Sequence, residues 1–182
     1  MKFRANVVLL AMLLAISSVS VCLAQKANDT ATAPPKEGVL KAADVGTKLF
    51  PDKVFFKGLM ATVQARNTGG VRYSDGSLVM AALVDASGYA SGIKEKYQAY
   101  LISEVPLEVG GQTLKPGAYG CGFIEGDKFV VMDLGANDVF QVSSTKDAEM
   151  KRPVPLQFVA GTNEGSYRFY KGRDYVEFRR AK

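Results

Sequence analysis

The segment GSYRFYKGRDYVEFRR, residues 165–180, alternates aromatic and charged side chains around a glycine-containing turn. A turn at Lys171–Gly172, or a longer one over residues 171–174, predicts an antiparallel hairpin with the same two faces in either case. The longer turn also sets Arg168 opposite Glu177. The faces consist of Tyr167, Phe169, Val176 and Phe178 on one side, and of Arg168, Tyr170, Tyr175 and Glu177 on the other. We expect the first face to be buried in a sheet and the second to be solvated, with arginine lying across tyrosine.

A second segment, YGCGFIEGDKFVVMDL at residues 119–134, predicts another hairpin. With Gly126–Asp127 as a two-residue turn, strict alternation assigns its side chains to two faces. These faces are Tyr119, Cys121, Phe123, Val130, Met132 and Leu134, and then Gly120, Gly122, Ile124, Phe129, Val131 and Asp133. Because both faces are largely apolar, we expect this hairpin to lie centrally in a sheet with both sides covered. Gly120 and Gly122 leave room for Phe129, another element or a ligand.

Two further turns set the expected pairing of other strands. Asp75–Gly76 suits a type I′ turn that pairs Tyr73 with Leu78, and Gly110–Gly111 suits one between Val109 and Gln112. The expected strands are 53–57, 59–66, 71–74, 77–85, 96–103, 118–125, 128–134 and 166–179, with weaker ones at 139–143 and 156–160. No helical repeat separates them, which excludes βαβ folds. The sequence therefore predicts an all-β, antiparallel single domain of about eight strands, barrel-like or sandwich/jelly-roll, with one short N-terminal helix within residues 40–50.

The first residues have the pattern of a secretory signal. Lys2 and Arg4 precede an apolar run over residues 7–16, and Cys22-Leu23-Ala24 has the small residues of a cleavage site. The expected organisation is a signal peptide (1–24), a flexible linker (25–39) and the β-domain (40–182). The apolar run is shorter than the roughly 20 residues of a spanning helix, so we expect no transmembrane segment after cleavage. The expected location is secreted or periplasmic.

Cleavage would lower the formal charge from +5 to +3, because it removes Lys2 and Arg4 and no acidic residue. So small a positive charge does not by itself predict binding to a polyanion. The expected extracytoplasmic location argues against a nucleic acid partner. Cleavage also leaves Cys121 as the sole cysteine, which excludes an intramolecular disulfide. We expect its thiol to be buried and inert.

The chain contains no histidine. This excludes Ser-His-Asp and Cys-His catalysis and the usual zinc sites, and no metal or cofactor is predicted. The Ser-x-x-Lys pattern at Ser91 and Lys94 lacks the other elements of a penicillin-binding enzyme, so we expect a solvated loop there. Glycoside hydrolysis needs only two carboxylates, and Asp85, Glu104 and Asp133 follow apolar strand residues that would raise their pKa. We regard such an enzyme as the least favoured alternative and lean against catalysis.

Two binding functions remain. The leading hypothesis is a secreted, non-catalytic binding or interaction β-domain with a pocket for a small apolar ligand. Its candidate residues are Gly120, Gly122, Phe129, Val131 and Asp133. The alternative is a protein that binds an anionic envelope component or a polysaccharide through a basic hairpin. Its candidate residues are Arg168, Lys171, Arg173, Arg179 and Arg180. The sequence predicts no particular oligomeric state.

Overall fold

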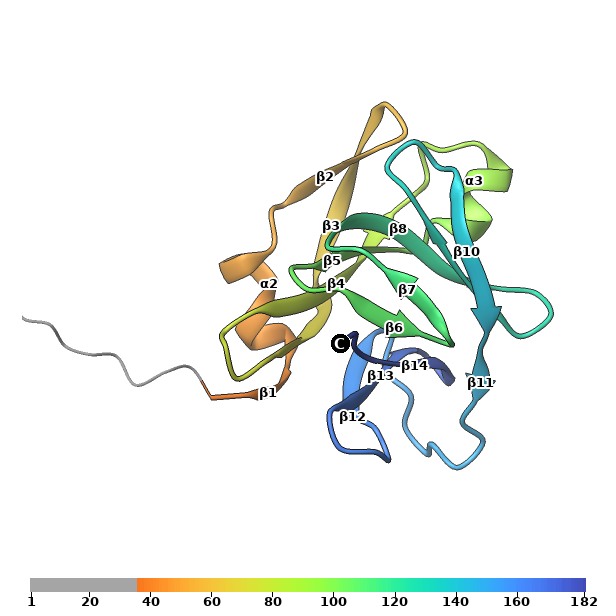
Figure 1. Cartoon of the computed structure of the whole chain (residues 1–182). Coiled ribbons are helices and arrows are strands. Elements are labelled where there is room, and N and C mark those ends of the chain that lie inside the picture. The colour runs from red at the N-terminus through yellow and green to blue at the C-terminus, as the bar shows by residue number, and fades with distance from the viewer. Residues whose placement is uncertain (1–35) are drawn as a thin grey trace, which may run out of the picture. The chain divides into compact units, whose positions relative to one another are not determined.

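Two antiparallel sheets account for most of the residues that the computed structural model describes, 36–182 (Figure 1). The predicted signal peptide and most of the predicted linker lie outside these residues. Sheet A contains β1 (Gly38–Leu40), β2 (Lys53–Phe56), β3 (Leu59–Arg72), β4 (Leu78–Asp85), β5 (Ala99–Ser103), β8 (Gly117–Ile124), β9 (Lys128–Met132) and β10 (Asp138–Ser143). Sheet B contains β6 (Leu107–Val109), β7 (Gln112–Leu114), β11 (Thr145–Lys146), β12 (Gln157–Ala160), β13 (Ser166–Lys171) and β14 (Asp174–Arg180).

In sheet A the strand order is β1-β3-β4-β5-β8-β9-β10, and β2 also pairs with β3. In sheet B the strand order is β12-β13-β14-β6-β7, and β11 also pairs with β14. Every pair is antiparallel, which confirms the predicted all-β class. Of the two architectures left open, residues 36–182 form two packed sheets and no closed barrel.

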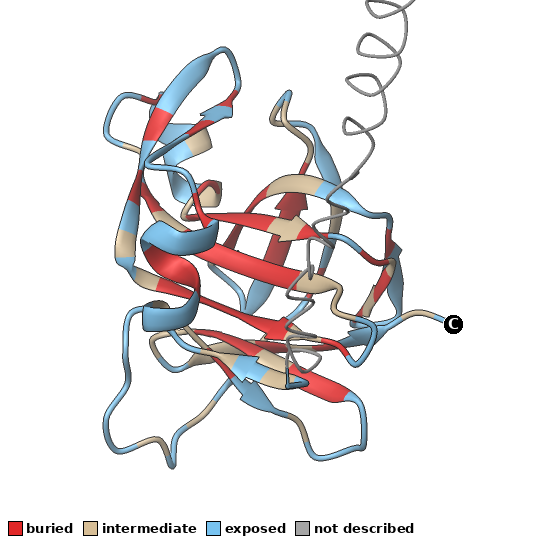
Figure 2. Cartoon of the chain, turned by 90° about the vertical axis from the view of Figure 1, so that its left-hand side faces the viewer, coloured by how far each residue is buried: buried red, intermediate tan, exposed pale blue. Residues whose placement is uncertain are grey.

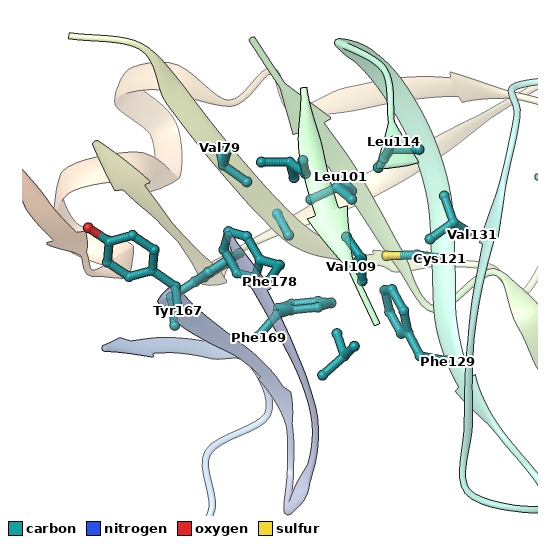
Figure 3. Packing of buried hydrophobic residues seen from close by; sticks show 14 of the residues in the cluster. Val79, Leu101, Val109, Leu114, Cys121, Phe129, Val131, Tyr167, Phe169 and Phe178 are labelled. Atoms are coloured by element: carbon teal, nitrogen blue, oxygen red, sulfur yellow. The ribbon is translucent and has the colours of Figure 1, made fainter. Parts of the chain in front are cut away.

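The described residues contain two hydrophobic clusters, one on each face of sheet A. The first lies between the sheets, where Phe169 and Phe178 of sheet B point toward Leu101 of sheet A (Figure 3). The second lies on the opposite face of sheet A, where side chains of α2 (Ala42–Leu49), of the β2–β3 hairpin and of residues 89–97 pack together. Strands β8 and β9 are interior strands covered on both sides, which confirms the central position predicted for residues 119–134.

The C-terminal hairpin has the predicted faces. Arg168 pairs with Glu177, and Tyr167, Phe169, Val176 and Phe178 are all buried in the inter-sheet cluster. The Arg168 guanidinium lies 4.8 Å from the centre of the Tyr175 ring. The prediction is wrong for Tyr170, which is 2% exposed. The centre of its ring lies 4.8 Å from that of the Tyr175 ring, and its hydroxyl donates to a carboxylate oxygen of Asp147, directly after β11, at 3.0 Å.

Two predicted registers are wrong by one residue, because each turn has three residues rather than two. Ile124 pairs with Lys128 around Glu125–Asp127, so Phe129 and Val131 share the face of Phe123 and Cys121 rather than that of the glycines. These are the pairs Phe123 with Phe129 and Cys121 with Val131.

At the other turn, Arg72 rather than Tyr73 pairs with Leu78. Within this turn only Gly76 has a positive φ, of 87°, whereas a type I′ turn needs two such residues. The turn at Gly110–Gly111 is confirmed by the pairing of Val109 with Gln112.

Some element boundaries also differ from those predicted. Helix α2 confirms the short helix before Pro51. The expected solvated loop at residues 91–94 is wrong, because α3 (Ser91–Lys96) forms there. Residues 38 and 39, which the sequence assigned to the linker, belong to β1, since this strand begins at Gly38. The segments predicted as strands 59–66 and 71–74 belong to one bent strand, β3, whose residues 64–67 have no partner in β4.

Within the part of the chain described, neither helix has the length and apolar character to cross a bilayer.

Candidate functional site

The predicted ligand residues do not converge on one pocket. The space in front of Gly120 is filled by the rings of Phe56 and Tyr97, which stack at 3.8 Å. The space in front of Gly122 is filled by the backbone of Lys96 and the side chain of Gln98. The glycines therefore admit the protein's own side chains and the end of α3.

The other three candidates lie elsewhere. Phe129 and Val131 are on the opposite face of sheet A, inside the inter-sheet core. Asp133 lies in the β9–β10 turn, where its carboxylate accepts hydrogen bonds from the backbone N–H groups of Gly135 (2.8 Å) and Asn137 (3.0 Å). The predicted grouping of these residues in one pocket is wrong, because it depended on a two-residue turn at Gly126–Asp127.

The space between the sheets is almost completely filled. The volume that could admit the centre of a water molecule is about 10 Å³. It is lined by Val79, Leu101, Leu107, Val109, Phe129, Phe158, Phe169, Val176 and Phe178. Such a space is at most the size of one water and offers no polar partner, so it stays dry. An apolar ligand would have to displace core side chains to enter it.

Cys121 is completely buried, and that burial raises the pKa of its thiol. We therefore expect a maleimide to leave Cys121 unlabelled in the folded protein at neutral pH and to label this residue stoichiometrically in denaturant, because the reactive species is an accessible thiolate. Mass spectrometry before and after unfolding measures this. Rapid labelling of Cys121 in the folded protein, identified in its peptide, would mean that Cys121 does not face the inter-sheet core.

The carboxylates considered for catalysis accept hydrogen bonds from backbone N–H groups. Asp85 accepts a hydrogen bond from the backbone N–H of Ser87 at 2.9 Å, and Glu104 accepts one from that of Leu78 at 2.7 Å. The expectation of raised pKa values is wrong for Asp85 and Asp133. Hydrogen bonds from Ser87 and from Asn137, respectively, lower the pKa of these carboxyls.

Three of the five basic candidates have carboxylate partners. Arg168 lies 3.4 Å from Glu177. Arg179 makes a forked contact with Glu108, with a closest distance of 2.8 Å, and Arg180 lies 2.6 Å from Asp75. Hydrogen bonds from Ser77 and Arg180 hold the pKa of Asp75 at about 2. The positive charge of these arginines is therefore largely compensated.

Lys171 and Arg173 differ from the other three. Neither has a carboxylate partner within residues 36–182, although Arg173 donates to the carbonyl oxygen of Met150 at 3.2 Å. Both lie at or beside the β13–β14 turn. At this turn the positive charges of the two predicted basic side chains are therefore not compensated by a neighbouring carboxylate among the described residues.

An exposed apolar group that sequence reasoning did not select lies at the end of the β2–β3 hairpin. Phe55, Leu59 and Met60 are 52%, 48% and 58% exposed, respectively. The hairpin projects from the sheets, with its turn drawn in the colour of exposed residues (Figures 1 and 2). We call these three side chains the tip patch. Large apolar side chains gathered at a projecting turn are typical of binding sites.

The backbone beneath the tip patch is held firmly. Lys57 and Gly58 both have positive φ, 49° and 79°, as a tight two-residue hairpin turn requires. The Lys57 N–H donates to the carbonyl oxygen of Leu134 at 2.8 Å. The hydroxyl of Tyr89 donates toward the carbonyl oxygens of Phe56 and Leu59, at 3.0 and 3.2 Å. The tip patch is therefore presented on a fixed frame.

One sequence signal could have identified the tip patch. Phe55 and Phe56 are adjacent in a strand, so their side chains point to opposite faces. Phe56 is fully buried against Tyr97, whereas Phe55 pairs across the hairpin with Met60 on the outer face. When two adjacent residues of a strand at the border of a sheet are both aromatic, the alternation of side chains thus predicts that one of the two is exposed.

Comparison with known proteins gives no further information about these residues. A scan against protein-family models found no match, and searches of curated proteins and of solved structures found none. Within residues 36–182, no three Cys, Asp or Glu side chains are grouped as metal ligands would be.

Proposed function

We propose that the chain is a secreted or periplasmic β-domain that binds a partner without catalysis, and that the tip patch is its binding surface. One observation carries this proposal: Phe55, Leu59 and Met60 are each about half exposed on a rigidly anchored turn. Exposed apolar side chains on a fixed frame bind with little loss of conformational entropy.

The proposal does not require an interior pocket. The space between the sheets is about 10 Å³, whereas sites for small molecules measure roughly 300–1,000 Å³. The outer surface is therefore the better supported place for a partner.

The other candidates have less support. The envelope or polysaccharide alternative has only Lys171 and Arg173 left from its five residues, because the three other arginines lie beside carboxylates. The carboxylate-pair enzyme has less support still, since Asp85, Glu104 and Asp133 all accept hydrogen bonds from backbone N–H groups in turns or at strand ends.

Photo-crosslinking tests the proposed function. Cells express the full chain with the photoreactive residue p-benzoylphenylalanine at position 55, and irradiation precedes mass spectrometry of the adducts. We expect an adduct, with protein or lipid, from position 55. The matched control carries the same residue at position 159, because Val159 is also exposed, at 39%, but lies on β12 in the other sheet. Equal yields from both positions, or no adduct from position 55, would reject the tip patch as the binding surface.

A further inference from the structure

We propose that the partner of the tip patch is a phospholipid bilayer, into whose interfacial region the β2–β3 turn inserts. This inference rests on the proposed function and assigns its partner class. It follows from where the exposed side chains lie around the hairpin, from how much area they offer, and from the basic residues that flank them.

The exposed apolar side chains lie on both faces of the hairpin. Phe55 and Met60 form a cross-strand pair on the outer face. Leu59 pairs with Phe56 and so belongs to the opposite face, where Phe56 is buried and Leu59 is not. A rigid protein surface that covered one face would leave the other in water. A fluid lipid phase surrounds a projecting turn and covers both.

The tip patch is too small for a stable protein interface. Its side chains are 52%, 48% and 58% exposed, and a large apolar side chain has roughly 200 Å² of surface, so together they offer on the order of 300 Å². A specific protein interface buries about 800 Å² on each partner. A pair of such tips would therefore not hold a dimer, whereas interfacial insertion needs only a few apolar side chains.

Two lysines flank the tip patch. Lys53 lies on the outer face two residues before Phe55, and Lys57 forms the turn itself; both are exposed. Long lysine stems let the ammonium groups reach lipid phosphates while the neighbouring apolar groups go deeper. Asp52 is adjacent to Lys53, and the charge of Lys57 contributes to lowering the pKa of Asp133. The local charge is therefore partly balanced, and we expect anionic lipid to strengthen binding only modestly.

Vesicle flotation tests the proposal. The protein secreted by cells that express the full chain is mixed with vesicles of phosphatidylglycerol and phosphatidylethanolamine, or of phosphatidylcholine alone. The test variant is Phe55→Thr with Met60→Thr, because threonine keeps the β-propensity of these strand positions. The control is Val154→Thr with Val159→Thr, which removes similarly exposed apolar groups, 40% and 39% exposed, distant from the tip. Circular dichroism verifies that both variants are folded.

We expect the unmodified protein and the control to float with both vesicle types, and the test variant to lose about a hundredfold in partition coefficient, since each buried apolar side chain contributes about tenfold or more. Equal flotation of the test variant and the control would overturn the proposal. So would the absence of flotation for the unmodified protein. Self-association that the test variant alone loses would identify a second copy as the occupant instead. If flotation fails while position 55 still crosslinks to a protein, the lipid assignment is wrong and the proposed function stands.

Discussion

Phe169→Ala should lower the free energy of unfolding by about 3–5 kcal/mol, the usual cost of deleting a buried aromatic ring. The ring is 3% exposed and stacks on Phe158 at 5.0 Å. It also contacts Phe123 and Phe129, at 5.9 and 5.8 Å between ring centres. The substitution thus opens a cavity where both sheets meet. Urea denaturation at a constant m-value measures the loss, which is large against a total stability of roughly 5–15 kcal/mol.

The neighbouring residue provides the matched control. Arg168→Ala removes a side chain from the outer face of the same strand, together with a part-exposed ion pair to Glu177 and a contact with the Tyr175 ring. Such interactions contribute about 1 kcal/mol. Equal losses for the two variants would mean that the assignment of the two faces of β13 is wrong.

Gly122→Ala should destabilise the domain by about 3 kcal/mol, the upper part of the usual range for overpacking. A methyl group at this position would collide with the backbone carbonyl of Lys96 at the end of α3 and with the amide of Gln98. That amide extends the sheet, because it donates to the carbonyl oxygen of Phe123 (2.8 Å) and accepts from its N–H (3.0 Å). The Gln98 amide cannot move without breaking these hydrogen bonds, and the Lys96 carbonyl is part of the backbone, so the strain cannot relax through side-chain rotation.

The same substitution at Gly92 should have the opposite sign. Gly92 lies in α3, and nothing lies within 4 Å of an added methyl group. Alanine is favoured over glycine in a helix by about 0.5–1 kcal/mol, so Gly92→Ala should raise the urea midpoint. If Gly122→Ala also raised it, the close approach of α3 to β8 would not exist.

Alternation along the sequence predicted much of the fold. It identified the buried face of residues 166–179 and the central position of residues 119–134, because both depend only on which residues are apolar. It failed where the number of residues in a turn mattered. One extra turn residue, Glu125, moved Phe129 and Val131 to the other face of sheet A. The predicted ligand group failed with it.

The tip patch and α3 were missed for a different reason. A strand pattern indicates that Phe55 and Phe56 face opposite ways, but only the packing of Tyr89 and Tyr97 determines which of them is covered. Residues 91–96 are short and carry no buried side chain, so they lack the periodicity that predicts a helix. The exposure of the tip patch therefore depends on contacts between segments distant in sequence, whereas α3 is too short to leave a pattern in its own residues.

The position of β14 has a consequence for biosynthesis. This strand pairs with β13 on one side and with β6 and β11 on the other, so it is the central strand of sheet B. Residues 107–109 of β6 pair locally with β7, but the other edge of β6 must wait for a partner that the ribosome supplies some seventy residues later, as the contact of Glu108 with Arg179 illustrates. Until residues 174–180 have been made, the apolar face of sheet A that sheet B will cover remains open to solvent. Contacts so distant in sequence slow folding and leave the incomplete chain prone to aggregation, so the two sheets can be completed only once residues 174–180 are available.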